Sequence, residues 1–302
     1  MPGISTNRSD ITLPTEVSQE IIQKTQQASA IMQLARQIDL PGRGLTIPVI
    51  TSDPEAAWVA ETGAKAVSNP GLSTKIMQAY KLAVIVPFSD EFRRDAAALY
   101  DALVARLPLA LAARFDQTVV GAVPKPGENF DNFANCTAQS LVKTESHSVY
   151  DGLVAAYEDI AAGKGSLNGF ALSPAAIGIL LGATDSTGRP LFISSTAEGG
   201  VNRVLGARTL ESRGVYKAGA APADSSAGNP AIVGIAGDWS QAMYGTVEGV
   251  QIRFADQTGL TINSQQVNLW ENNMFAVRAE IELGFRADTA CFNLLTGATP
   301  AA

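Results

Sequence analysis

Residues 43–51 read RGLTIPVIT, residues 57–61 read AWVAE, and residues 72–87 read LSTKIMQAYKLAVIVP. A polar segment at residues 62–71 is rich in residues that favour turns. The pattern predicts one long β-hairpin over residues 43–88, whose return arm of about 16 residues spans about 50 Å. Ordinary strands have about 5–6 residues, and an isolated two-stranded ribbon is at best marginally stable in water. We therefore expect a surface outside the chain, and first of all a second copy of it, to cover this hairpin.

The composition sets wide limits. The chain has 302 residues, of which 46% are hydrophobic and 17% charged, enough for one large domain or two smaller ones. The low charge content fits either a surface that meets much other protein or a merely alanine-rich composition. The net charge of −7 provides no basic field for nucleic acid, so any contact with DNA should be weak.

The sequence also indicates where the protein is made. It shows no signal peptide and no apolar run of about 20 residues that could span a bilayer. Cys136 and Cys291, the only two cysteines, lie among apolar or small residues and are expected to be buried free thiols. We therefore expect synthesis in a reducing cytosol and no membrane.

The clearest helical pattern follows the hairpin. Ser89 is a suitable N-cap, and apolar residues then recur every three or four positions down to about Val120. At 1.5 Å per residue, this helix is roughly 45 Å long. Pro108 lies inside it and should kink it, because proline lacks the amide hydrogen of the helical ladder.

Shorter elements fill much of the remaining chain. We expect a helix opened by Pro14 and a helix capped by Ser148, with Asp151 as its capping partner. A short buried strand at residues 170–172 precedes a helix at residues 173–181, where a Ser-Pro pair forms the start.

The strongest strand signal lies near the C-terminus. Apolar and charged residues alternate over residues 275–288, so one face of the strand is apolar and the other is charged. Glu280 and Glu282 point to the same side. With Arg278 and Arg286 beside them, they indicate a charge ladder that faces another strand or subunit, in preference to an acid–base pair.

No stretch of the sequence carries a recognisable active site. His147 is the only histidine and directly precedes a helix cap, which favours a structural role over catalysis or metal binding. Residues 163–169, GKGSLNG, resemble a phosphate loop only superficially, since their spacing misses both nucleotide-binding patterns. The Gly-x-Ser-x-Gly motif of serine hydrolases is missing. We expect no catalytic, cofactor-binding or metal-binding residues, and a protein that is not an enzyme.

The order of the parts resembles a known family. The fragments, in chain order, are LP at 13–14, IP at 47–48, AWVAE at 57–61, KLA at 81–83, VPFSDE at 86–91, Asp95, GFALSP at 169–174, DSTGRPL at 185–191, GDW at 237–239 and RAE at 278–280. Each is weakly specific alone. Together, from about Pro14 to Leu295, they resemble the major capsid proteins of tailed bacteriophages, which have the Hong Kong 97-like fold.

The resemblance implies an α+β capsid fold with six segments. These are an N-terminal arm at 1–13, a short helix and connector at 14–40, the extended β-hairpin called the E-loop at 41–88, a peripheral domain with a long spine helix at 89–165, an axial domain at 166–240, and peripheral-domain strands with the C-terminus at 241–302.

The resemblance also implies a function. Such proteins self-assemble into hexamers and pentamers that form the icosahedral head shell around the double-stranded DNA genome, without specific DNA binding. The expected location is the head capsid of the virion, assembled in the host cytoplasm. Met1 lies almost directly before the arm, so a separate scaffold protein is expected, with a portal and, in some shells, decoration proteins.

Some members of the family form a covalent cross-link between subunits. An E-loop lysine, here Lys65 or Lys75, forms an isopeptide bond with an asparagine of a neighbour. The candidate asparagines are Asn263, Asn268, Asn272 and Asn273. No pattern selects one pair, and no residue is assigned a catalytic role.

Two other functions stay open on the sequence. A cellular encapsulin compartment shares the fold, although the long E-loop and the polar arm favour a virus. A small-molecule enzyme with an unrecognised site is the alternative from another class. The leading interpretation predicts that deletion of about residues 56–77 leaves a soluble, folded subunit that no longer closes shells.

Overall fold

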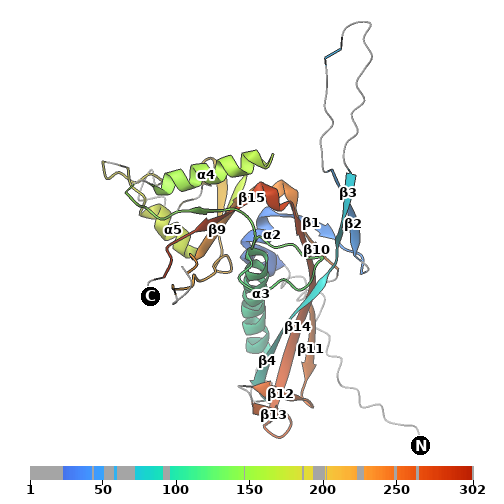
Figure 1. Ribbon diagram of the computed structural model, residues 1–302. Coiled ribbons are helices and arrows are strands. Elements are labelled where there is room, and N and C mark those ends of the chain that lie inside the picture. The colour runs from blue at the N-terminus through green and yellow to red at the C-terminus, as the bar shows by residue number, and fades with distance from the viewer. Residues whose placement is uncertain are drawn as a thin grey trace, which may run out of the picture.

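The structure is a computed structural model. It describes residues 23–42, 44–50, 58–59, 72–90, 96–145, 147–185, 187–192, 201, 203–222, 228–247, 250–262 and 265–300. The helix expected from Pro14 begins outside these ranges; residues 23–28 are helical, and α2 (Ala30–Leu34) follows. Figure 1 shows two sheets, with α3 (Ala96–Val120) along one, and α4 (Val149–Ala162) and α5 (Pro174–Leu181) beside the other.

The first sheet is built around β14 (Met274–Ala287), where apolar and charged residues alternate as predicted. One edge of β14 pairs antiparallel with β4 (Tyr80–Ser89). The other edge pairs antiparallel with β10 (Ala242–Thr246) and β11 (Gln251–Ala255), and β1 (Arg36–Asp39) lies parallel to β10. The apolar face of β14 is buried against α3, through side chains such as Phe115, Val119 and Phe285.

The second sheet has six strands. Their order is β5 (Ala138–Ser140), β15 (Phe292–Thr296), β9 (Ile232–Gly237), β6 (Gly169–Leu172), β8 (Ala207–Glu211) and β7 (Arg203–Val204). The predicted strand at residues 170–172 is confirmed as part of β6 and is fully buried. Helices α4 and α5 pack on this sheet, and each has the serine N-cap that the sequence predicted.

Two expected domain boundaries, at residues 165 and 241, stay predictions, and the packing of the second sheet bears on both. Helix α4 lies against the second sheet, so a division at residue 165 would cut through one hydrophobic cluster. Strand β15 also belongs to the second sheet, because it inserts between β5 and β9, although residues 241–302 were expected to lie with the first. We expect the burial of shared apolar side chains, more than position along the chain, to set the domain divisions.

The hairpin differs from the prediction in its second half. Over the described part of the hairpin, β2 (Leu45–Ile50) pairs with β3 (Leu72–Met77). The chain then leaves the hairpin, and β4 pairs with β14 over residues 80–89. Ser89 is the last residue of β4 and Asp90 begins a 3₁₀ turn, while residues 91–95 lie outside the described ranges, so the predicted cap at Ser89 stays a prediction. The alternating apolar side chains of β4 are covered by the chain's own core, so the ribbon that needs an outside surface is shorter than expected.

Candidate functional site

The β2–β3 hairpin projects away from both sheets (Figure 1). It forms a two-stranded sheet of its own, with Leu45 opposite Met77 at its base and Ile50 opposite Leu72 at its far end. Ile76 is half exposed. Because a lone ribbon gains little from its own pairing, the contacts at its base determine the direction in which it points.

Close backbone approach fixes that base. Met77 is fully buried, and Gly284 of β14 lies beneath it. A Cβ atom on Gly284 would come within 3.0 Å of the Met77 side chain and 2.9 Å of the Gln78 carbonyl oxygen. Gly44 has a φ of +84°, and a Cβ atom there would lie 2.7 Å from the Met77 carbonyl oxygen. Glycine is required at both positions, by space at Gly284 and also by backbone conformation at Gly44.

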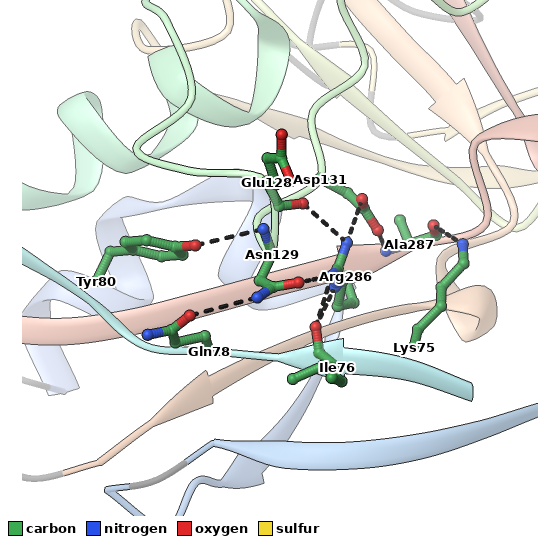
Figure 2. Close-up of polar contacts among 9 residues, drawn as sticks. All are labelled: Lys75, Ile76, Gln78, Tyr80, Glu128, Asn129, Asp131, Arg286 and Ala287. Carbon is green, nitrogen blue, oxygen red and sulfur yellow. Dashed lines mark hydrogen bonds and ion pairs between the residues drawn. The ribbon is translucent and has the colours of Figure 1, made fainter.

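Arg286, near the end of β14, joins the hairpin to the body of the subunit (Figure 2). Its Nε atom donates a 2.8 Å hydrogen bond to the carbonyl oxygen of Ile76 in β3, and Nη2 donates to the same oxygen. Its Nη1 atom forms a 2.7 Å ion pair with Asp131. Its Nη2 atom also donates to Asn129 Oδ1 at 3.0 Å. One guanidinium group therefore binds a strand of the hairpin and a loop that follows the long helix.

Further hydrogen bonds connect the same three segments (Figure 2). Lys75 Nζ donates to the carbonyl oxygen of Ala287 at 3.2 Å. The Asn129 side-chain amide donates to Gln78 Oε1, and its backbone amide donates to the Tyr80 hydroxyl. The residues that make these contacts form the Arg286 cluster, which consists of Lys75, Ile76, Gln78, Tyr80, Glu128, Asn129, Asp131, Arg286 and Ala287.

The Arg286 cluster connects the hairpin to the subunit body through hydrogen bonds and one ion pair. The Arg286 and Asp131 side chains are 11% and 18% exposed, so water screens their attraction only weakly. The guanidinium donors are used by protein oxygens of fixed position, which leaves the base of β3 little freedom to swing. The Arg286 cluster therefore orients the β2–β3 hairpin so that it extends beyond the surface of its own subunit.

The predicted charge ladder is present on the outer face of the first sheet. Lys81 of β4 lies 3.0 Å from Glu280 and 3.4 Å from Glu282, and Arg278 lies 3.5 Å from Glu280. The hydrogen bond with Lys81 lowers the pKa of Glu280, and the same bond raises the pKa of Lys81. Arg286 does not join this ladder, although it was expected beside it, because the loop residues Asn129 and Asp131 bind it instead.

The candidate cross-linking residues lie at opposite ends of β14. Lys75 is next to Ala287, while Asn268 ends β13 (Gln265–Asn268), whose hairpin with β12 (Gly259–Ile262) adjoins the Met274 end (Figure 1). Asn272 Nδ2 donates to the carbonyl oxygen of Asn268. Lys65 and Asn263 lie outside the described residues. Any bond from Lys75 to Asn268 or Asn272 would therefore have to join two subunits.

His147 and the glycine-rich loop at residues 163–169, to which the sequence gave no catalytic role, both form hydrogen bonds within the fold. His147 Nε2 lies 2.9 Å from the Ser140 carbonyl oxygen, beside the capped start of α4. In the loop at residues 163–169, the amide of Ser166 donates to the Asp238 carboxylate. Burial would raise the pKa of Asp238, but hydrogen bonds from Ser240, Ser166 and Asn168 hold it below its ordinary value. The loop thus donates hydrogen bonds to a carboxylate of its own chain, through the Ser166 amide and the Asn168 side chain.

Both cysteines are free thiols. Cys291 is buried and Cys136 is partly buried. Burial raises the pKa of Cys136 to about 12 and also raises the pKa of Cys291. Among the described residues, no group of three or more histidine, cysteine, aspartate or glutamate side chains could hold a metal ion. No helix in the described part of the chain is long and apolar enough to cross a membrane.

One buried acid was not singled out by the sequence. Asp116 lies on α3 with no exposed surface and accepts hydrogen bonds from Ser29 at 2.5 Å, Ser212 at 2.6 Å and the Ala30 amide at 3.3 Å. Desolvation raises its pKa to about 6, although these hydrogen bonds oppose the shift. The helical pattern of α3 gave no signal for this role, because the two serine partners lie 87 and 96 residues away in the sequence.

The two sheets, the long helix and the projecting hairpin form the Hong Kong 97-like fold. The chain is similar to solved chains of Gordonia phage Cozz, with a TM-score of 0.68 at 22% identity, and of Mycobacterium phage Adephagia, with a TM-score of 0.68 at 20% identity. These matches cover 90% of this chain, and 87% and 91% of the other two.

Sequence comparison leads to the same class. The chain belongs to the phage capsid family, whose model matches residues 10–289. It is also 26% identical over 294 residues to the probable major capsid protein gp17 of Mycobacterium phage L5, a match that covers 91% of this chain and 86% of that protein. Membership in this family does not favour the encapsulin alternative.

Proposed function

We propose that this chain is the major capsid protein of a tailed phage and that its hexamers and pentamers close an icosahedral head around double-stranded DNA. The carrying observation is the β2–β3 hairpin, which the Arg286 cluster points away from the subunit body. A ribbon held rigidly at its base and left uncovered fits a part that lies on a neighbouring subunit. The similar capsid of a native GTA particle was computed with C5 symmetry, which supports five-fold rings.

The expected segments can be assigned to the fold with revised limits. We assign the first sheet with α3 to the peripheral domain, and the second sheet with α4 and α5 to the axial domain. The E-loop shortens from residues 41–88 to the hairpin between β2 and β3, because β4 belongs to the first sheet. Residues 1–13 keep their proposed role as an arm.

Assembly of a closed shell that is filled with DNA requires further proteins. We propose a separate scaffold protein, a portal and, in some shells, decoration proteins, with assembly in the host cytoplasm and the virion head as the final location. The net charge of −7 suits an inner wall that does not retain the genome. The role is structural, with no catalytic step.

The decisive experiment shortens the hairpin. The deletion of residues 56–77 that the sequence suggested would remove Met77, which is fully buried, and would damage the core. A cleaner variant replaces residues 51–71 by Asn-Gly, because Ile50 and Leu72 are directly opposite and a two-residue turn can join them. The variant keeps the Arg286 cluster whole.

We expect the shortened subunit to melt like the wild type and to form no closed shells by electron microscopy. Mixed with wild-type subunits, it should block shell growth in proportion to its share, since it can receive a neighbour's hairpin but gives none. Closed shells of wild-type diameter from the shortened chain alone would rule out the proposal.

A further inference from the structure

A small apolar cavity opens on the surface of the first sheet. It has a volume of about 180 Å³ and lies between α3, the start of β4 and the loop after α3. Phe115, Phe130 and Leu283, each 3% exposed, are among the core residues that line it. Two prolines of the loop, Pro124 and Pro126, also line it and are exposed. The volume suits one large side chain and is too small for a folded partner.

Two cationic side chains line the cavity. Arg114 of α3 and Lys81 of β4 line it, and exposed Lys125 lies between the two prolines in the loop. Lys81 is bound by Glu280 and Glu282. Within the described part of the chain, Arg114 forms no ion pair with a carboxylate. The cavity therefore has an aromatic floor and at least one uncompensated positive charge, which suits an aromatic side chain with acidic neighbours.

The chain itself contains a segment of that chemistry. Trp58 is fully exposed, and Val59 beside it is partly exposed. Residues 53–61 read DPEAAWVAE, with three carboxylates and no basic residue. Trp58 also belongs to the segment between β2 and β3, which the proposed function places on a neighbouring subunit. A fully exposed indole offers a large apolar surface that a partner of matching chemistry can bury.

We propose that Trp58 of one subunit inserts into the cavity beside Phe115 of a neighbouring copy, where the acidic sequence of residues 53–61 complements the charge of Arg114. This inference rests on the proposed function and specifies which contact the hairpin makes. The indole packs edge-to-face on the phenylalanine rings, and the guanidinium of Arg114 lies against its face or pairs with a carboxylate. The occupant of the cavity is therefore a side chain from a second copy of this chain.

The first test measures the critical concentration for assembly. Trp58→Ala should raise it about 30-fold, which equals about 2 kcal/mol for the loss of a central aromatic contact. Val59→Ala, which truncates the adjacent apolar residue, should raise it less than threefold. Arg114→Glu should also raise it, whereas Arg106→Glu, at another exposed position of α3, should not. Arg114→Glu combined with Glu61→Arg or Glu55→Arg should restore assembly.

The second test follows Trp58 directly. In a Trp270→Phe background, Trp58 is the exposed indole, because Trp239 is buried. Acrylamide should quench Trp58 in free subunits and not in purified shells. If closed shells form with Trp58 still quenched, or if free monomers already protect it, the inference is overturned while the proposed function stands. If the wild type closes no shell under any assembly condition, both fail.

Discussion

The contacts of the Arg286 cluster predict that truncating Arg286 destabilises the subunit much more than truncating Arg278, which lies on the same strand. Arg286→Ala removes the donors to Ile76, Asn129 and Asp131. Arg278→Ala removes the same charge from the same strand, but the Arg278 side chain is 44% exposed and its contact with Glu280 is 3.5 Å long. The second variant is therefore a matched control for charge and for residue type.

The expected loss of folding free energy follows from how deeply the ion pair is buried. Removal of one partner from a buried ion pair costs about 3–5 kcal/mol, because the other charge is left without compensation. Asp131 is 18% exposed and keeps the Ala287 amide at 3.2 Å, so the low end, about 3 kcal/mol, applies. The exposed Arg278 pair contributes about 0.5 kcal/mol or less. The loss of free energy for Arg286→Lys should lie between these two values. A lysine ammonium keeps the positive charge but lacks the several planar N–H donors of the guanidinium group.

Two measurements check this expectation. In the free subunit, Arg286→Ala should lower the melting temperature by about 6 °C, at about 2 °C per kcal/mol for a large domain, and Arg278→Ala by about 1 °C. Hydrogen exchange should become faster at the amides of residues 72–77 in the first variant alone, since the hairpin base loses its connection to β14 and the loop.

Comparison of Arg286→Ala with Arg278→Ala separates two roles of the cluster, stabilising the subunit and orienting the hairpin. If both lower the melting temperature equally, the cluster does not stabilise the subunit as argued. If Arg286→Ala destabilises the subunit while exchange over residues 72–77 stays unchanged, the cluster supports the core and does not orient the hairpin.

The remaining predictions concern one acid, one glycine and two thiols. The pKa of Asp116 is raised to about 6 in the folded state from 3.8, so protonation favours folding; its stabilising effect is full below pH 3.8 and is lost as the pH rises through 6. In urea unfolding, the free energy of unfolding of Asp116→Asn should rise by about 3 kcal/mol relative to that of the wild type between pH 4 and pH 7. If the free energies of unfolding of the two proteins changed with pH in parallel, the raised pKa of Asp116 would be contradicted. Gly44→Ala should cost about 1–3 kcal/mol by the same unfolding assay, because φ is +84° and the methyl group meets the Met77 carbonyl; an unchanged free energy of unfolding would show that the turn can relax. Cys136 and Cys291 should not react with a thiol reagent at pH 8 until the protein is unfolded, since the thiolate is the reactive form; rapid labelling of the native subunit would exclude this.

Local patterns predicted many of the elements. The Ser148 and Ser173 caps, the buried strand at residues 170–172 and the alternation of β14 depend on neighbours a few residues apart, and the structure confirms all four. The error at residues 78–89 has a different origin. Alternating residues indicate a strand but do not identify its partner, and β4 pairs with a strand about 190 positions later in the sequence.

The sequence by itself determined the class of the protein, because the order of many weak local signals is preserved across the chain. It also predicted a hairpin, of which the structure confirms the pairing of β2 with β3, whereas β4 pairs with β14. Only the tertiary structure decided how that hairpin is held, since Arg286, Asn129 and Ile76 are brought together from three separate segments. The same holds for Asp116 and for the cavity beside Phe115. Contacts between distant segments depend on how the sheets and α3 pack, and periodicity within one segment carries no information about that packing.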